Sequence, residues 1–235
     1  MNLHYRFREE QEEREGPNRR LWHGASFRAA TFSRRVDFEN VVFSASSSFS
    51  NATFEAEPPL LLGASFHEGT EWRGTKWPLP KSVKDAGTFV DAYACLKLEM
   101  DRLKKHEDEL DFFALELQSR RVLLGPWRGL PIALYGWLCD FGRSYTRPLW
   151  GLVVIWIGFL LPFWIGLGQL KLMEALGLSL ANTFGVFGFR KEFISAKLLD
   201  EMPGILKFLA GTQTALGAAF LFLFALALRN KFRMK

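Results

Sequence analysis

Residues 149–168 read LWGLVVIWIGFLLPFWIGLG, a run of 20 residues without a charged side chain. An α-helix of this length, rising about 1.5 Å per residue, covers the hydrocarbon core of a bilayer, which is about 30 Å thick. Residues 205–228 (ILKFLAGTQTALGAAFLFLFALAL) form a second run, and its one charged residue, Lys207, lies near one end. A lysine at that place can extend its side chain to the membrane surface. The sequence therefore predicts an integral membrane protein with two transmembrane helices.

The charged residues indicate how these helices are oriented. The N-terminal sequence lacks the apolar core of a secretory signal peptide, so we expect it to stay in the cytoplasm. Two spans return the chain to the side on which it began. The basic residues near that side are Arg128, Arg143, Arg147, Arg229, Lys231, Arg233 and Lys235. The loop between the spans has only Lys171, Arg190, Lys191 and Lys197, so both termini are predicted to be cytoplasmic.

Aromatic residues recur every five or six residues between residues 27 and 54, and a small or β-branched residue stands two places before each. Neither a flat strand nor an α-helix keeps such positions on one face, so the chain must turn between the aromatics. The pattern predicts a parallel β-helix with two interior columns of rings, each built in steps of 11 residues. One column is Phe27, Phe38 and Phe49, and the other is Phe32, Phe43 and Phe54.

The segments ASFRAATF, VDFENVVF and SSFSNATF within residues 25–54 resemble the pentapeptide-repeat superfamily, in the variant where steps of five and six residues alternate. The likeness covers residues 24–77. It implies a right-handed quadrilateral β-helix, which binds or supports partners and has no catalytic residues. We expect residues 1–23 to cap one end of this β-helix and the β-helical domain to reach residue 82.

Apolar residues follow at spacings of three and four between residues 86 and 124. They predict either one coiled-coil-like helix or two helices folded against each other near residues 104–107. Such helices either cap the β-helix or form a self-associating stalk. We expect a helical linker over residues 83–148, with a short helix at the membrane surface, and a membrane domain over residues 149–235. The linker resembles that of membrane-bound pentapeptide-repeat proteins, and we expect a location in a bacterial inner membrane.

Between the spans, residues 170–182 predict a short helix, and an extended loop with two glycines follows. The order of span, short helix, glycine loop and span resembles the pore module of potassium channels. The resemblance implies a pore loop of Thr183, Phe184, Gly185, Val186, Phe187 and Gly188. Gly188 comes one place late for a Thr-x-Gly-x-Gly filter, and Arg190 and Lys191 follow, so we expect poor selectivity among cations or permeation by anions. An ordinary re-entrant or surface loop is the alternative.

The second span has polar and small residues in its middle. Thr212, Gln213, Thr214 and Gly217 are candidates to line a pore or to pack helices, and Phe220 and Phe224 are candidates for a hydrophobic gate. Two spans cannot enclose a pore alone. We therefore expect a homo-oligomer, most simply a tetramer, that conducts inorganic ions and gives Gln213 a symmetric partner. The alternative is a membrane-anchored scaffold or sensor that presents its β-helix to a cytosolic protein partner.

Nothing in the sequence indicates an enzyme. The carboxylates between residues 107 and 116 lie in a charged helical stretch, which favours a solvated helix face over acid–base chemistry. The four histidines share no metal-ligand spacing, so no metal site and no cofactor are expected. No partner nucleic acid is expected either.

Overall fold

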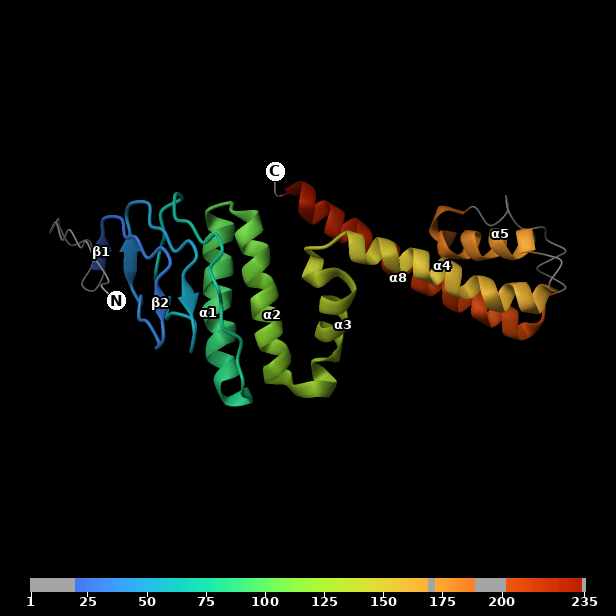
Figure 1. Cartoon of the computed structure of the whole chain (residues 1–235), viewed down its shortest axis with the longest axis horizontal. Helices are drawn as coiled ribbons and strands as arrows, with labels where there is room; N and C mark the ends of the chain where they lie inside the picture. The colour runs from blue at the N-terminus through green and yellow to red at the C-terminus, as the bar shows by residue number, and fades with distance from the viewer. Residues whose placement is uncertain (1–19, 169–171, 189–201, 234–235) are drawn as a thin grey trace. The chain divides into compact units, whose positions relative to one another are not determined.

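The computed structural model describes residues 20–168, 172–188 and 202–233 (Figure 1). The chain divides into two compact units. Unit 1 ends at Leu134, and unit 2 runs from Tyr135 to Arg233. Of the expected N-terminal cap, residues 1–19 lie outside the described part of the chain.

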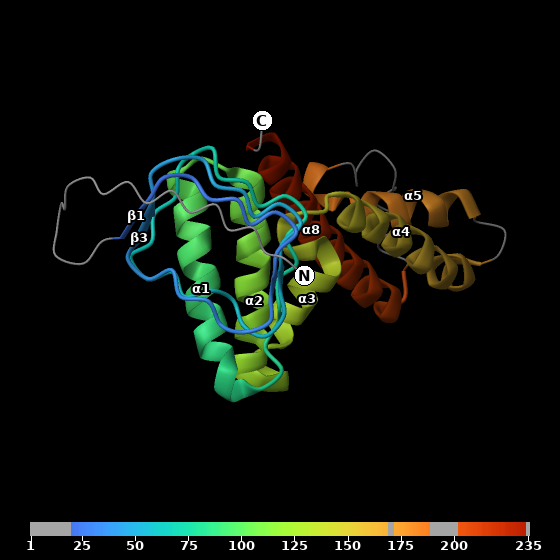
Figure 2. The ribbon, with the colours of Figure 1, turned by 60° about the vertical axis from the view of Figure 1, so that its left-hand side comes forward.

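Unit 1 begins with short strands that pair in parallel. These strands are β1 (Arg20–Trp22), β2 (Thr31–Phe32), β3 (Val41–Phe43) and β4 (Thr53–Phe54). β1 pairs with β3 and β2 with β4, and isolated parallel bridges such as Ser48 with Glu71 and Thr53 with Lys76 add a third layer. The chain therefore passes the same core three times, and the passes run side by side in Figure 2.

The predicted right-handed quadrilateral β-helix over residues 24–82 is wrong. The residues that the structure describes are 62% helical, and they form only four short strands in two small parallel sheets, not a β-helical solenoid. Turns occupy much of each pass, and Ala29, Asn40 and Asn51 in these turns have positive φ. Because the turns end each ladder after two or three residues, no continuous sheet forms. The prediction from Ser, Thr, Val and Phe content gave too much β-strand, because the β-propensity of a residue depends on how its side chain packs.

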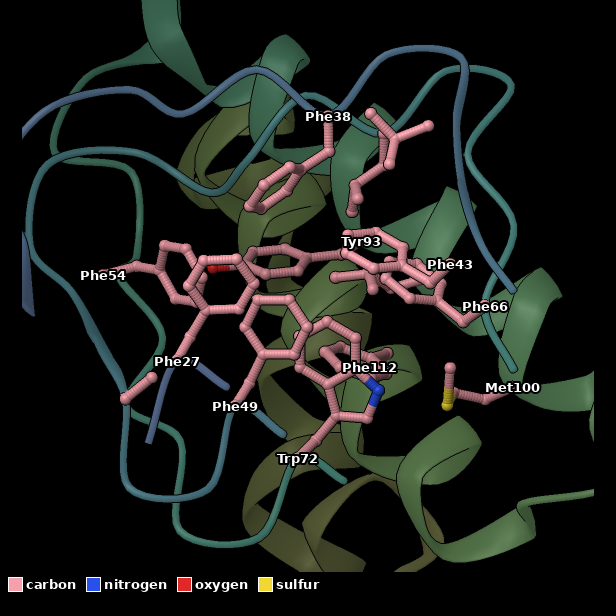
Figure 3. Close-up of a cluster of buried hydrophobic side chains, with 14 of the residues drawn as sticks. Phe27, Phe38, Phe43, Phe49, Phe54, Phe66, Trp72, Tyr93, Met100 and Phe112 are labelled. Atoms are coloured by element: carbon pink, nitrogen blue, oxygen red, sulfur yellow. The ribbon is translucent and has the colours of Figure 1, made fainter. Parts of the chain in front are cut away.

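Rings from successive passes stack face to face in the core of unit 1 (Figure 3). The Phe49 ring lies between Phe27 and Trp72, with centroids 4.8 and 4.2 Å away. Phe54 likewise lies between Phe32 and Trp77, at 4.8 Å from each. Each step along a column is therefore one whole pass, such as the 22 residues from Phe27 to Phe49.

The two predicted columns, built in 11-residue steps, are wrong. Phe38 meets Phe43 and Phe49 edge-on, and Phe43 stacks on Phe66 in a third column, with centroids 4.8 Å apart. Two aromatics separated by 11 residues lie on the same pass, so they meet across the core and do not stack. Five of the six phenylalanines are buried, and Phe32 is partly exposed.

Two helices close the last pass of unit 1. These are α1 (Val83–Arg102) and α2 (His106–Arg128), and a short turn separates them. Of the alternatives that the apolar spacing allowed, the structure shows two helices packed as a cap. Tyr93 and Met100 of α1 and Phe112 of α2 are buried in the aromatic core, and the Phe112 ring meets Trp77 edge-on at 5.1 Å. The Ser82 side chain caps α1 by accepting a hydrogen bond from the Asp85 N–H.

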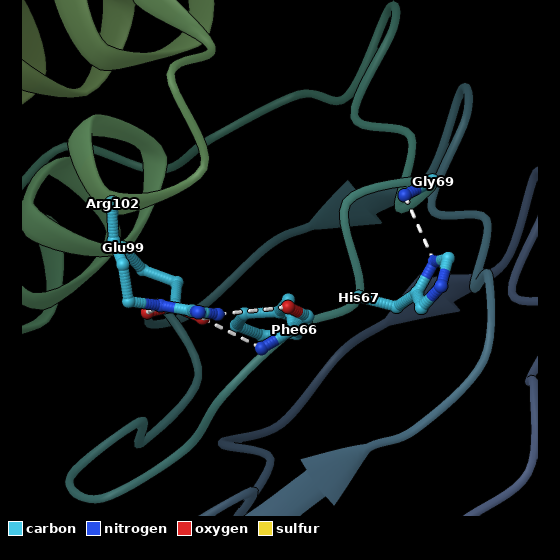
Figure 4. Close-up of polar contacts among 5 residues, drawn as sticks. All are labelled: Phe66, His67, Gly69, Glu99 and Arg102. Atoms are coloured by element: carbon cyan, nitrogen blue, oxygen red, sulfur yellow. Dashed lines mark hydrogen bonds and ion pairs between the residues drawn. The ribbon is translucent and has the colours of Figure 1, made fainter.

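Side chains of α1 also bind the free backbone edge of the last pass (Figure 4). Glu99 Oε1 accepts a hydrogen bond from the Phe66 N–H at 2.7 Å, and Arg102 Nη2 donates to the Phe66 carbonyl at 3.0 Å. Arg102 also donates to Glu99 Oε1 at 2.6 Å. Unpaired backbone groups at a sheet edge are costly when buried and invite aggregation when exposed. The Glu99–Arg102 pair supplies the bonds that a further pass would supply.

We expect Glu99→Ala to lower the free energy of unfolding of unit 1 by about 1–3 kcal/mol, because it leaves the Phe66 N–H without its acceptor. Arg102→Ala should cost less, since the arginine side chain is 57% exposed and solvent weakens its ion pair. Pulse proteolysis of the full chain in detergent micelles measures both. Asp91→Ala, an exposed carboxylate on the same helix, is the control. Equal losses in all three variants would contradict the role of Glu99.

Candidate functional site: a short helix between two apolar helices

Unit 2 contains the apolar helices. Its elements are the end of α3 (Leu130–Cys139), the 3-10 turn η1 (Asp140–Gly142), α4 (Thr146–Leu167), α5 (Leu172–Thr183), the 3-10 turn η2 (Gly185–Phe187) and α8 (Gly204–Arg233). Helices α4 and α8 are long and apolar enough to cross a membrane, which confirms the predicted pair. Most of their apolar surface is not covered within the chain. A core helix of a soluble protein would instead be mostly buried.

Helices α4 and α8 are antiparallel and approach each other at two glycines of α4. A Cβ at Gly151 would lie 1.9 Å from the Phe220 ring, and one at Gly166 would lie 2.7 Å from Leu206. These contacts join the start of α4 to the second half of α8, and the end of α4 to the start of α8. Phe220, a predicted gate residue, therefore packs on α4 within one chain. Phe224, the other predicted gate residue, is partly buried.

The short helix α5 folds back along this hairpin (Figure 1). Ser179 Oγ donates to the carbonyl of Trp156 at 2.6 Å, and Trp156 lies 10 residues after Thr146 and 11 before Leu167. At the last residue of α5, the Thr183 backbone touches Gly217 so closely that a Cβ there would lie 2.3 Å from the Thr183 carbonyl oxygen. The 12 residues of α5 span about 18 Å, against about 33 Å for α4. Helix α5 therefore ends near half the length of the apolar hairpin.

A buried amide holds α5 in this place. Gln213 Nε2 of α8 donates to the Ser179 carbonyl at 3.0 Å, to Ser179 Oγ at 2.8 Å and to Thr183 Oγ1 at 2.9 Å. A carbonyl can only accept, so the amide nitrogen of Gln213 must face α5. A symmetric partner for Gln213 in an oligomer was predicted, but the structure provides hydrogen-bond partners for its amide nitrogen within one chain. Sequence alone could not find them, because Ser179 and Gln213 are 34 residues apart.

Several polar atoms of this cluster have no hydrogen-bond partner among the described residues. They are Gln213 Oε1, both side-chain polar atoms of Asn182 and Trp156 Nε1. Gln213 is 0% exposed and Asn182 1% exposed. Buried polar groups without partners are costly, and in an apolar segment they indicate a functional site. Asn182 was not among the predicted site residues, and the one signal for it in the sequence is an amide within a short apolar helix.

The predicted pore loop has a different conformation from the one expected. Thr183 ends α5, and Gly185–Phe187 forms the 3-10 turn η2 in place of an extended loop. The Phe187 N–H donates to the Phe184 carbonyl, and the N–H of Gly188, which has φ 77°, donates to the Gly185 carbonyl. These local bonds continue the helix end as a tighter turn. Val186 and Phe187 are exposed, and residues 189–191 lie outside the described part of the chain.

The other candidates in α8 form local contacts. Thr212 Oγ1 donates to the Phe208 carbonyl at 3.1 Å, and Thr214 Oγ1 donates to the Ala210 carbonyl at 2.9 Å, both within the helix itself. Thr214 also lies beside Gly185, where an added Cβ would meet its methyl group at 3.0 Å. Gln213 and Gly217 are thus the two predicted residues of α8 that contact α5 directly.

Ser179, Asn182, Thr183 and Gln213 carry hydroxyl and amide groups, which do not titrate near neutral pH. These side chains therefore suit binding of water or of an ion and not proton transfer. Comparisons of the chain with known protein families, with curated proteins and with solved structures return no match. Function must therefore be inferred from this geometry.

Proposed function

We propose that the chain is a subunit of an oligomeric membrane channel for cations. In this proposal α4 and α8 cross the bilayer, and α5 is a re-entrant helix that enters between them and ends at half depth. The observation that carries the proposal is this end of α5, where Ser179 of α5 bonds to the Trp156 carbonyl of α4 and where Gln213 and Gly217 of α8 contact α5. A half-helix that ends inside the membrane is a recurring element of ion pathways.

The backbone after α5 supports a pore. Irregular backbone at membrane depth is tolerated where it is buried in protein or lines a water-filled path, because lipid cannot satisfy its polar groups. Turn η2 is such backbone, and its residues Val186 and Phe187 are exposed in a single chain. Neighbouring subunits or water must therefore cover it. The carbonyl end of α5 carries partial negative charge, which favours a cation over an anion there.

The exposed faces of the two spans differ, which supports assembly through α8. On α4 the exposed residues include the large side chains of Trp150, Val154, Ile157, Leu161 and Ile165, and the exposed small residues are Gly158 and Gly166. On α8, Gly211, Ala215 and Ala219 are exposed at four-residue steps. Small residues at this spacing let helices approach closely, whereas large apolar residues suit contact with lipid. We propose that α8 surrounds the axis of a homo-oligomer, most simply a tetramer, and that α4 faces lipid.

The ends of the hairpin support cytoplasmic termini. Asn230 Nδ2 at the end of α8 donates to the Gly142 carbonyl before α4 at 3.3 Å, so these two ends lie together. Lys231 lies 5.2 Å from the centre of the Tyr145 ring, and Arg147 is nearby in sequence. Basic residues at one end of a hairpin favour the cytoplasmic side. We therefore propose an inner bacterial membrane protein with this end of the hairpin in the cytoplasm.

Cation flux through liposomes that contain the purified full chain tests the function. We expect potassium or sodium flux from the wild type, and a loss of about tenfold or more in Gln213→Leu, which removes the donors that hold α5. Thr214→Val is the matched control, because the Thr214 hydroxyl donates to the Ala210 carbonyl of its own helix and valine keeps the shape of the side chain. Chemical cross-linking in the same liposomes reports the subunit number.

If the wild type stays monomeric and carries no flux under voltage or membrane tension, the channel proposal fails. The membrane-anchored scaffold then becomes the better account, because unit 1 has a core of its own to present to a partner. If Gln213→Leu and Thr214→Val conduct as the wild type does, α5 is not part of the conducting element.

A further inference from the structure

Three side chains that can bind a metal meet at the turn between α1 and α2. The turn brings Asp101, near the end of α1, beside His106 and Glu109 at the start of α2. One potential ligand atom from each lies within 4.8 Å of the other two. His106 Nδ1 and Glu109 Oε2 are 3.0 Å apart, because residues three apart share one face of a helix.

We propose that Asp101, His106 and Glu109 form a binding site for a divalent transition-metal ion, with zinc as the ion that fits best. Zinc lies about 2.0–2.2 Å from nitrogen and oxygen ligands, so two ligands at a tetrahedral angle are about 3.4 Å apart. The distance of 3.0 Å between His106 and Glu109 is close to this value, and the Asp101 ligand atom lies within 4.8 Å of both, so small side-chain rotations at the surface can complete the site. Three protein ligands leave a fourth position for water.

The ligand types select among metals. One imidazole nitrogen with two carboxylates suits zinc and its neighbours in the first transition row. Calcium takes six to eight oxygen ligands, and magnesium keeps an octahedral shell of oxygens and several waters. Neither ion matches a site with a nitrogen ligand and three protein groups.

The surrounding charge also favours a cation. Glu107, Asp108 and Asp111 add carboxylates next to the three ligands. Neighbouring carboxylates repel one another, and a divalent cation would relieve this repulsion. The ammonium group of Lys105 is bonded to the Thr70 carbonyl of the last pass.

Metal bound here joins the end of α1 to the start of α2, and so stabilises the two helices that cap the aromatic core. The proposal is independent of channel function. The spacing of the histidines in the sequence did not indicate this metal site. Its three ligands come from two helices, and only one of the three ligands is a histidine.

Zinc titration calorimetry on the tag-free full chain in detergent tests the site. We expect one zinc ion per chain and a rise in the melting temperature of unit 1. Asp101→Asn, His106→Gln and Glu109→Gln should each weaken binding by at least about tenfold, which is the effect of losing even an indirect support of a metal ligand. Glu55→Gln, at an exposed glutamate, and His67→Gln are matched controls that remove the same chemical groups outside the site.

Cobalt provides a readout that does not depend on stability. We expect visible absorption bands of a cobalt ion with fewer than six ligands in the wild type, and their loss in His106→Gln, with unchanged circular dichroism. The proposal is overturned if the wild type binds no zinc at about 1 mM. It is also overturned if the three site variants bind zinc as tightly as the two controls, or if magnesium at equal concentration displaces zinc.

Discussion

Phe49→Ala is expected to lower the free energy of unfolding of unit 1 by about 3–5 kcal/mol, a large part of the stability of a domain of this size. Phe49 is 0% exposed and occupies the middle layer of its column, between Phe27 and Trp72. Parallel bridges from Ser48 to Ser26 and to Glu71 hold the three passes at strand spacing. The passes cannot close over the lost ring, so the substitution leaves a cavity.

Pulse proteolysis of the full chain across a urea series measures this loss. Phe32→Ala should cost clearly less, because Phe32 is partly exposed and stacks on a single neighbour, Phe54. Leu62→Ala is the surface control; Leu62 is 68% exposed and should change stability by under about 0.5 kcal/mol. A Phe49→Ala protein as stable as Leu62→Ala would show that the stacked rings do not form the core.

Gly217→Ala is expected to displace α5, abolish cation flux and destabilise unit 2 by about 1–3 kcal/mol. The added Cβ would lie 2.3 Å from the Thr183 carbonyl oxygen and 3.0 Å from the Thr183 carbonyl carbon. Backbone atoms at a helix end cannot rotate away as a flexible side chain can. Helix α5 must therefore move off α8, which breaks the bonds from Gln213 to Thr183 and Ser179.

Gly158→Ala is the matched control on α4. Gly158 lies within a helix and is exposed, and a Cβ there meets no atom within 4 Å. Alanine is the better helix former by about 1 kcal/mol, so this variant should be neutral or more stable and should conduct normally. Both variants replace a glycine with alanine, but Gly217→Ala should lower the stability of unit 2 and Gly158→Ala should leave it unchanged or raise it. Thermal unfolding in micelles and liposome flux measure them; equal behaviour would contradict a close approach of α5 to α8.

For helix α5, the sequence predicts the helix but not the conformation of the residues that follow it. Its existence and its place between the spans followed from apolar residues and from flanking glycines, and the structure has a helix over Leu172–Thr183. The conformation of residues 184–188, which follow α5, could not be predicted from the sequence, because both an extended strand and a 3-10 turn accept glycines at residues 185 and 188. Local hydrogen bonds at Phe184 and Gly185 select the turn.

By itself the sequence determined the two apolar helices and the aromatic content of the core. The free energy of transferring a helix from water to hydrocarbon is the sum of contributions from its own residues. A run such as residues 149–168 is therefore sufficient to predict such a helix. The tertiary structure alone decided which rings stack, that Glu99 and Arg102 bind the Phe66 backbone, and that Gln213 holds α5. It also decided that Asp101 meets Glu109 across a turn. These contacts join separate segments of backbone, and their partners are set by the distances and directions that packing imposes, which no local pattern of residues encodes.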